Sequence, residues 1–344
     1  MSFGSRSIMK RIITILLLTV MLAGCGQKSH TYTPNQDGLI DVSVQIDGAA
    51  VPYYAPMYVA QERGFFAEQG LNVSFYYASA AEIVKNVGSN NIEFGFPNAD
   101  PVIIGRANGV PVKIVHTTLQ NGLGSVIFKD ASGIKVPSDL KGKTIGITSY
   151  GSPNYSQLKM LLETEGLTID DVTIKIIGTG AIVNALITDQ VDAISFSMLR
   201  TYELRANGEA VSEFRSNEFT TTYGNVVIVS DTFLETNPEL VEGFIKALNK
   251  SLEYITDGNL EDAVDLSIDN YAQSAKNSRD KFVTIMDDAY VNGLWQSEDT
   301  KIHGFGYNNR ERYQLFIDDL AKFGIISKSY DASELIVEGG ANHE

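Results

Sequence analysis

The chain has 344 residues, of which 44% are hydrophobic and 20% charged, a composition typical of a globular protein with a large buried core. Its formal net charge is −15, which argues against a nucleic-acid partner because such a partner needs a basic face. The one cysteine excludes an internal disulfide or a cysteine-based metal site, and the four histidines show no ligand spacing. We therefore expect neither a metal nor a cofactor.

Residues 1–24 are predicted to be a signal peptide, because cations precede an apolar run from Ile12 to Leu22. That run is shorter than the roughly 20 residues that a membrane-spanning helix needs. It leads into LAGC (residues 22–25), which resembles the bacterial lipoprotein cleavage box and implies lipidation of Cys25. An ordinary secretory signal followed by an accidental cysteine is the alternative. Residues 25–40 are polar, and we expect a flexible tether that holds the folded body outside the cytoplasm, at the cell membrane.

The body contains two copies of one strand–helix pattern. In the first copy the alternation of apolar residues predicts strands at 42–46, 71–77 and 92–96, with helices at 55–69 and 81–87.

The second copy repeats this order with an offset of 99 residues, so that Val73 matches Val172 and Glu93 matches Asp192. Its predicted strands lie at 143–148, 172–177 and 191–196, and its predicted helices at 154–165 and 181–188. Strands that alternate with helices indicate parallel βαβ units, and two such units indicate two α/β lobes.

The pattern changes after the second copy. A strand is predicted at 225–229, and a long helix then begins at Pro238 with Asn237 as its cap and ends near Thr256. Residues 260–325 are expected to be largely helical, with a last helix at 312–323.

The expected fold class is therefore α/β with two lobes, each a βαβ-based mixed sheet with flanking helices, and a ligand cleft between them. We expect lobe 1 to be discontinuous, at 41–119 and 224–344, and lobe 2 to span 120–223. Ligands of open α/β sheets bind beyond the carboxyl ends of the strands. The loops expected to line the cleft are 47–56, 96–101, 117–124, 148–156, 178–181, 196–203 and 222–225.

Two stretches carry a resemblance to a known family. YAPMYVAQERGFF (residues 54–66) and GLNV (residues 70–73) resemble the opening of solute-binding proteins of ABC importers, in the group that handles alkanesulfonates, nitrate, taurine, riboflavin and thiamine pyrimidine precursors. GVPV (109–112) and VPSDLKGK (136–143) are also similar. The resemblance covers most of 41–325 and implies the type II periplasmic binding protein fold. It also implies a monomer that closes on a small-molecule solute and delivers it to a permease with its ATPase subunit.

The loop from Gly146 to Ser152 has two glycines five residues apart, but no Lys-Ser/Thr follows, so a nucleoside triphosphatase is not expected. We interpret it as a strand-to-helix loop whose free N–H groups face the cleft. Ser149, Tyr150 and Ser152 are candidate ligand contacts there, and simple helix capping is the alternative. In lobe 1 the matching candidates are Asn98 and Asp100, with the same alternative.

Aromatic residues favour a flat ligand. Tyr53 and Tyr54 follow the first strand and could sandwich a ring, or could pack against their own lobe. Gln120 lies at the expected lobe crossing, where it could bridge ligand and hinge or hold only the turn. The remaining candidates are expected in the same region by topology: Phe196, Tyr202, Glu203, Tyr223 and Asn225.

These observations lead to one main functional hypothesis and three alternatives. The main hypothesis is a solute-binding lipoprotein for a flat heterocycle, either a thiamine pyrimidine precursor or riboflavin. An alkanesulfonate, taurine or nitrate ligand is the first alternative, although Arg200 is the only cation in the expected cleft loops. A ligand-sensing lipoprotein is the second. The third is an enzyme like the pyrimidine synthase of this fold family, which uses a cysteine-rich motif that this chain lacks; we expect no enzyme.

Overall fold

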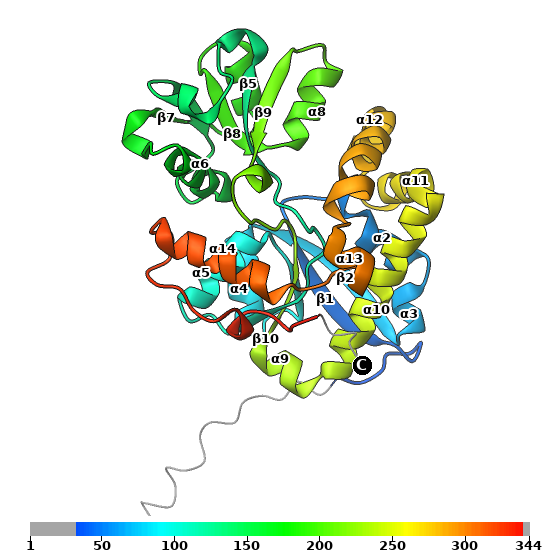
Figure 1. Cartoon of the computed structure of the whole chain (residues 1–344). Coiled ribbons are helices and arrows are strands. Elements are labelled where there is room, and N and C mark those ends of the chain that lie inside the picture. Colours follow the sequence, from blue (N-terminus) through cyan, green and yellow to red (C-terminus); the bar gives the residue numbers. More distant parts are fainter. Residues whose placement is uncertain (1–31, 340–344) are drawn as a thin grey trace, which may run out of the picture.

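A computed structural model describes residues 32–339 of the chain. The predicted signal peptide, Cys25 and the first part of the predicted tether lie outside the described residues. Two five-stranded mixed sheets form the centres of two lobes, which are stacked one above the other (Figure 1). We call the part built on the first sheet lobe 1 and the part built on the second sheet lobe 2.

The sheet of lobe 1 has the strand order β2-β1-β3-β10-β4. The first three strands run parallel, and β10 is antiparallel to both β3 and β4. The strands are β1 (Ile40–Asp47), β2 (Leu71–Ala78), β3 (Phe94–Phe96), β4 (Val112–His116) and β10 (Val227–Ser230).

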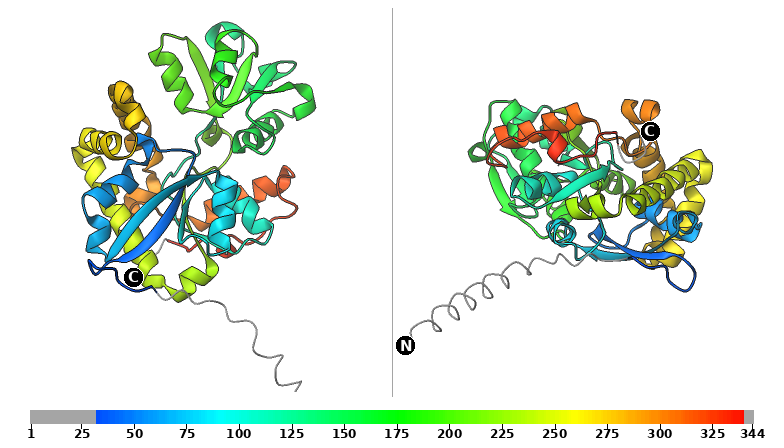
Figure 2. Two further views of the ribbon diagram at one scale, coloured as in Figure 1. Left: turned by 180° about the vertical axis from the view of Figure 1, so that it is seen from behind. Right: turned by 90° about the horizontal axis from the view of Figure 1, so that it is seen from below.

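The sheet of lobe 2 has the order β7-β6-β8-β5-β9, again with three parallel strands followed by an antiparallel one. Its strands are β5 (Gly124–Lys129), β6 (Thr144–Ile147), β7 (Thr173–Ile176), β8 (Ala193–Ser197) and β9 (Val211–Arg215). The chain passes from lobe 1 to lobe 2 through 117–123 and returns through 219–226, and both connections lie at the waist of the molecule (Figure 2).

The helices of the two repeats flank these sheets. In lobe 1 they are α2 (Ala55–Glu62), α3 (Phe65–Glu68), α4 (Ala80–Gly88) and α5 (Ala99–Ala107). In lobe 2 they are α6 (Pro153–Thr164), α7 (Ile182–Ile187) and α8 (Leu199–Ala206). The single helix predicted at 55–69 is wrong in one respect: it breaks between α2 and α3 at Gly64, whose φ of +75° is left-handed.

Further helices follow β10 and pack on lobe 1. Pro238 begins the longest of them as predicted, but the Asn237 side chain makes no capping hydrogen bond and instead donates to Thr236 Oγ1. They are α9 (Asp231–Thr236), α10 (Pro238–Tyr254), α11 (Leu260–Asn270), α12 (Arg279–Ile285), α13 (Glu298–His303) and α14 (Arg310–Lys322).

The acids that match in the two repeats have one structural role. Glu93 accepts a hydrogen bond from the backbone N–H of Ser43 in β1 at 2.9 Å, and Asp192 accepts one from the N–H of Thr144 in β6 at 2.7 Å. Glu93 also accepts from the Tyr32 hydroxyl at 3.0 Å. The end of the predicted tether therefore lies against lobe 1 rather than free of it.

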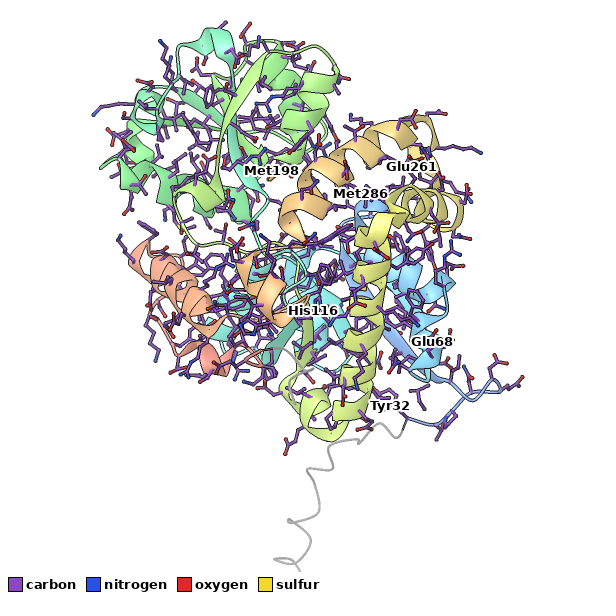
Figure 3. All side chains as sticks on the ribbon, turned by 45° about the vertical axis from the view of Figure 1, so that its right-hand side comes forward. Tyr32, Glu68, His116, Met198, Glu261 and Met286 are labelled. Atoms are coloured by element: carbon purple, nitrogen blue, oxygen red, sulfur yellow. The ribbon has the colours of Figure 1, made fainter. Side chains whose placement is uncertain are left out.

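Apolar contacts join the lobes at two places. Met198 and Leu199, at the start of α8, belong to the apolar cluster that contains Met286 of lobe 1, and both methionines lie at the junction in Figure 3. On the other side, Met160 of α6 packs with Tyr223 and with residues of α14. The two contacts flank the waist, so the lobes are held close on either side of it.

Candidate functional site

A cavity of about 780 Å³ lies between the lobes. Lobe 1 lines it with the end of β1, with α4, and with α5 and the residues that follow it as far as Val110. Lobe 2 lines it mainly with the β6–α6 loop and the first turns of α6. This volume is in the usual range of small-molecule sites. The polar side chains of the lining come from Asp47, Ser79, Lys85, Asn98, Asp100, Asn108, Thr148, Ser152, Asn154, Ser156, Gln157, Thr179, Ser197 and Tyr223.

The two lobes exchange a hydrogen bond across this cavity. Gln157 Nε2, on α6, donates to Asp100 Oδ1, on α5, at 3.3 Å. Both side chains are almost fully buried, with 5% and 1% of their surfaces exposed. Gln157 Oε1 has no hydrogen-bond partner. An acceptor that is buried without a partner costs about 1–3 kcal/mol, so this oxygen is a natural place for a ligand N–H group.

Acidic groups outnumber cations in the lining, where the charged side chains are Asp47, Asp100 and Lys85. Burial raises the pKa of Asp100 to about 6, partly offset by the hydrogen bond from Gln157. Burial also raises the pKa of Asp47, against hydrogen bonds from Asn98 and from backbone groups. Carboxyl groups in such an environment disfavour a second negative charge close by.

The β6–α6 loop reaches the cavity at both of its ends, through Thr148 and through Gly151 and Ser152. Ser152 caps α6, because its Oγ accepts from the N–H of Tyr155 at 3.2 Å, and it also lines the cavity. Capping and cavity lining are thus not alternatives for this residue. Ser149 and Tyr150 are exposed and are not among the lining residues; the Tyr150 ring packs edge-on against Tyr155.

Tyr53 and Tyr54 lie in a different place from the large cavity. Together with Trp295 and other side chains they surround a space of only about 10 Å³, room for about one water molecule. The Tyr53 ring is stacked on Tyr290 at 5.1 Å, and the Tyr54 hydroxyl donates to the Asp47 carbonyl at 2.6 Å. The Tyr53 ring therefore already has an aromatic partner from its own lobe.

Three candidates on the side of α8 interact mainly with each other and with neighbouring cations. Glu203 forms an ion pair with Arg200 at 2.6 Å, and that guanidinium lies over the Phe196 ring. Arg215 lies over the Tyr202 ring at 5.8 Å. None of Phe196, Tyr202 and Glu203 is among the residues that line the large cavity.

Asn98 and Asn225 hold the edge of the site together. Their backbones form an isolated β-bridge, and Asn225 Nδ2 donates to the Phe96 carbonyl at 3.1 Å. Asn98 Nδ2 donates to Asp47 at 3.3 Å and lines the large cavity, whereas Asn225 lines the small aromatic space.

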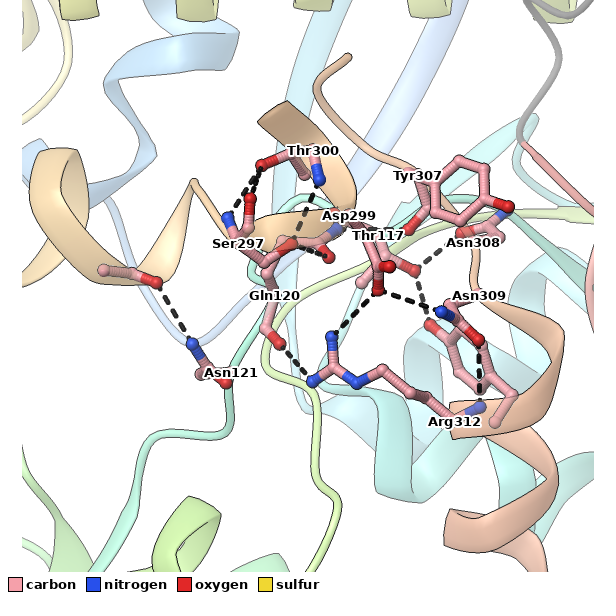
Figure 4. Close-up of polar contacts among 12 residues, drawn as sticks. Thr117, Gln120, Asn121, Ser297, Asp299, Thr300, Tyr307, Asn308, Asn309 and Arg312 are labelled. Atoms are coloured by element: carbon pink, nitrogen blue, oxygen red, sulfur yellow. Dashed lines mark hydrogen bonds and ion pairs between the residues drawn. The ribbon is translucent and has the colours of Figure 1, made fainter. Parts of the chain in front are cut away.

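Gln120 is a structural residue of the first crossing. Its side chain donates to the carbonyls of Thr117 and Tyr307 and accepts from Ser297 Oγ at 3.0 Å (Figure 4). It is fully buried and does not line the large cavity.

Arg312 of α14 connects both crossings. Its Nη2 donates to the Gln120 carbonyl at 3.1 Å, and its guanidinium lies 4.6 Å from the centre of the Tyr223 ring in the second crossing. Tyr223 is buried, stacks on Tyr313 and lines the large cavity. Its hydroxyl has no hydrogen-bond partner.

Several lining residues are not among the site residues predicted individually from the sequence. Asp47, Gly124, Thr148, Thr179 and Ser197 all fall within loops that the topology rule had selected, but no side-chain signal distinguished them. Gln157 lies one residue beyond the selected 148–156 loop, and no local signal in the sequence distinguishes it.

Within residues 32–339, no helix is both long and apolar enough to span a membrane. In the same part of the chain, no three His, Cys, Asp or Glu side chains gather in a way that could hold a metal ion.

Comparison with known proteins identifies the relatives of this chain. It is 25% identical to the riboflavin-binding protein RibY of Chloroflexus aurantiacus over 94% of this chain and 95% of the relative. It is 26% identical to the formylaminopyrimidine-binding protein of Halalkalibacterium halodurans over 76% of this chain and 78% of the relative. A 4-amino-5-hydroxymethyl-2-methylpyrimidine phosphate synthase of Saccharomyces cerevisiae is 28% identical over 59% of this chain and 64% of the relative.

Solved structures agree on the fold. The periplasmic aliphatic sulphonate binding protein SsuA from Escherichia coli superimposes with a TM-score of 0.66 at 15% identity, over 87% of this chain and 92% of that one. The fold expected from the sequence, that of the periplasmic binding proteins, is thereby confirmed. The NMT1/THI5-like family model matches residues 51–258, more than half of the sequence. The chain belongs to the NMT1/THI5-like family.

Proposed function

We propose that the protein is the extracytoplasmic solute-binding component of an ABC importer, and that it captures a small flat heterocycle between its lobes. The observation that carries the proposal is the cavity of about 780 Å³, which both lobes line and across which Gln157 reaches Asp100. Residues from opposite lobes can enclose a ligand only if the lobes come together, so closure and binding are coupled. The proposed ligand class is a thiamine pyrimidine precursor or riboflavin, in line with the names of two relatives.

In this proposal the closed protein docks on a permease and its ATPase subunit and acts as a monomer. Lipidation of Cys25 anchors it to the outer side of the cell membrane. Lobe 1 comprises 41–119 and 224–344, and lobe 2 comprises 120–223. The proposed ligand contacts within the large cavity are Asn98, Asp100, Ser152 and Tyr223.

The other sequence-based candidates keep supporting roles in this proposal. Tyr54, Gln120 and Asn225 hold the cavity wall or the crossing through hydrogen bonds to the backbone. The remaining candidates do not line the large cavity: Tyr53, Ser149, Tyr150, Phe196, Tyr202 and Glu203.

An alkanesulfonate, taurine or nitrate is the second candidate ligand. The feature that favours it is the start of α6, a helix of twelve residues with Ser152 as its cap, because helix N-termini bind anions. The charges of the lining favour the neutral ring, since two carboxyl groups face one ammonium group.

Catalysis like that of the related synthase is the third candidate. The resemblance implies a cysteine-rich motif for that chemistry, and the one cysteine of this sequence is Cys25. A binding role therefore suits the residues better. A sensing role would use the same cavity and would differ only in the partner.

Thermal unfolding of the full-length chain in detergent, followed by the fluorescence of Trp295, tests the proposal. The panel contains riboflavin, a 4-amino-2-methylpyrimidine, ethanesulfonate, taurine and nitrate. A ligand present at a hundred times its dissociation constant adds about 2.7 kcal/mol to the free energy of unfolding. We expect this stabilisation from a ring compound. Stabilisation by the anions alone would contradict the proposed ligand class.

A further inference from the structure

Two hydrogen-bond acceptors from opposite lobes meet in the large cavity. Asp100 belongs to the first turn of α5 in lobe 1, and Gln157 belongs to α6 in lobe 2. Their side chains touch through the 3.3 Å bond from Gln157 Nε2 to Asp100 Oδ1. That bond orients the amide, so its nitrogen points to the carboxyl group and its oxygen points elsewhere. Gln157 Oε1 is left buried with no partner.

Gln157 Oε1 lies directly over Gly124. A Cβ atom added at Gly124 would lie 1.4 Å from this oxygen, so the amide rests directly over the glycine. Gly124 does not need a left-handed backbone, because its φ is not positive. The space that the missing side chain leaves is therefore what lets the glutamine oxygen reach its position.

The unmet requirement of this pair is for hydrogen-bond donors. A carboxyl group accepts several hydrogen bonds through its two oxygens, and an amide oxygen accepts two. Asp100 therefore has acceptor capacity beyond its bond to Gln157, and Gln157 Oε1 has all of its capacity free. Nitrate or a simple alkanesulfonate without an amino group supplies acceptors only. A primary amino group on a flat ring supplies two N–H donors that diverge from one nitrogen, which is what two acceptors on opposite lobes require.

We propose that Asp100 and Gln157 form a specificity pair that recognises a primary amino group on the ring of the solute, with one N–H donated to each lobe. This inference rests on the proposed function and narrows its ligand to amino-substituted rings such as an aminopyrimidine. Because the donors bridge the lobes, recognition of the amino group also favours the closed arrangement. Riboflavin, which has no primary amino group, satisfies the pair less well.

The test is calorimetric titration of the full-length chain in detergent with a 4-amino-2-methylpyrimidine and with its 4-oxo analogue. These probes share ring and size and differ at the amino position. We expect the wild-type chain to prefer the amino compound by about tenfold or more, as for a hydrogen bond to a charged or buried group. Asp100→Asn is expected to remove most of this preference.

A second variant acts on the pair without altering either member. Gly124→Ala forces Gln157 Oε1 to move and is expected to reduce the preference in the same way. Glu82→Gln is the matched control for Asp100→Asn, since both convert a carboxylate to an amide. Glu82 lies exposed on α4, outside the cavity lining. Thermal unfolding without ligand identifies any variant that fails to fold, and the other variant then decides.

The outcomes separate the two proposals. If the wild-type chain binds ring compounds but Asp100→Asn and Gly124→Ala both keep the wild-type preference between the probes, the specificity pair is wrong and the solute-binding function stands. If the wild-type chain binds the rings with no preference for the amino compound, the specificity pair is again wrong. If the wild-type chain binds neither these rings nor riboflavin, the proposed function is wrong, and the specificity pair, which rests on that function, is wrong as well.

Discussion

The two lobes are built on one plan and differ in what they place at the cleft. Each sheet has three parallel strands followed by an antiparallel one, in the orders β2-β1-β3-β10 and β7-β6-β8-β5. The antiparallel strand of each lobe adjoins a crossing: β5 follows the first and β10 follows the second. Each crossing also follows a strand of the lobe that it leaves, β4 for the first and β9 for the second. The crossings are therefore anchored in a sheet at both ends, which confines relative motion of the lobes to the short segments between the strands.

The loops after the first strand of each plan show the clearest difference. In lobe 2 the loop between β6 and α6 lines the large cavity with Thr148 and Ser152. In lobe 1 the matching loop carries Tyr53 and Tyr54, which close on Tyr290 and Trp295 and leave almost no space. One loop is thus available to a solute and its counterpart is occupied by the protein's own aromatic side chains.

The helices after the third strand differ in the same sense. The second residue of α5 is Asp100, which is buried at the cavity, and the second residue of α8 is Arg200, which is paired with Glu203. The cation of lobe 2 is satisfied internally, whereas the acid of lobe 1 faces the cavity. This asymmetry explains why equivalent positions do not contribute equally to one site.

The first prediction compares two glycines inside the sheets, Gly95 in lobe 1 and Gly146 in lobe 2. A Cβ atom at Gly95 of β3 would lie 2.6 Å from Ile83 and 2.8 Å from Ile228, both fully buried. Gly95→Ala is therefore expected to lower the free energy of unfolding in urea by about 1–3 kcal/mol through overpacking. At Gly146 of β6 the nearest atoms would be 3.3 Å away. Gly146→Ala is expected to change stability by less than about 1 kcal/mol, and equal losses would contradict the comparison.

Asp100 should make the free energy of unfolding of the chain depend on pH. Burial raises its pKa to about 6 from the ordinary value of 3.8. Between these values the folded chain holds a proton that the unfolded chain releases, so this group's contribution to stability falls as the pH rises from 4 to 6. Asp100→Asn is expected to be more stable than wild type at pH 8 by about 2–3 kcal/mol and similar to it at pH 4.

Urea unfolding at several pH values checks this prediction. Buried His116, whose pKa is lowered to about 4, produces the opposite slope between pH 4 and 6.5, but it is common to both proteins and cancels in their difference. A difference between variant and wild type that does not change with pH would show that Asp100 is ionised normally.

Tyr53 and Tyr54, in the aromatic loop between β1 and α2, should contribute differently to stability through their hydroxyl groups. Tyr54→Phe removes the 2.6 Å bond to the Asp47 carbonyl and is expected to cost about 1 kcal/mol. Tyr53→Phe removes a buried hydroxyl that has no partner and is expected to be neutral or stabilising. Both variants should bind the solute like wild type. A large loss of affinity in Tyr53→Phe would place the ligand against the aromatic loop instead.

A small effect is expected at the cap of α6. Ser152→Ala loses the bond to the Tyr155 N–H and is expected to cost about 1 kcal/mol of stability. If Ser152 also contacts the solute, affinity falls as well, as measured by calorimetry. Exposed Ser149→Ala is the control, and it should leave the affinity unchanged.

Most of the framework could be predicted from the sequence because its signals are local. Apolar alternation and the glycine stops located the strands and helices of both repeats, and the repeat offset paired Glu93 with Asp192. The division of Phe65–Glu68 from α2 was missed because it depends on one left-handed glycine. The topology rule selected the loops around the cavity.

Side-chain roles at the site were harder to predict because they depend on contacts between the lobes. Tyr53 was a reasonable candidate for stacking, but its partner is Tyr290, more than two hundred residues away in the sequence. Asp100 lies in a loop that the topology predicts to line the cleft, whereas Gln157 lies outside those loops. Gln157 has a role at the site only because α6 approaches α5. No local pattern in the sequence encodes that approach.

In the proposed function the solute binds between the lobes, in the cavity lined by α5 and α6. A crystal structure of the chain with a bound 4-amino-2-methylpyrimidine would locate the solute. We expect the ring between Asp100 and the first turns of α6, with its amino group within hydrogen-bond distance of Gln157 Oε1. A ring bound among Tyr53, Tyr290 and Trp295, with the large cavity empty, would contradict this expectation.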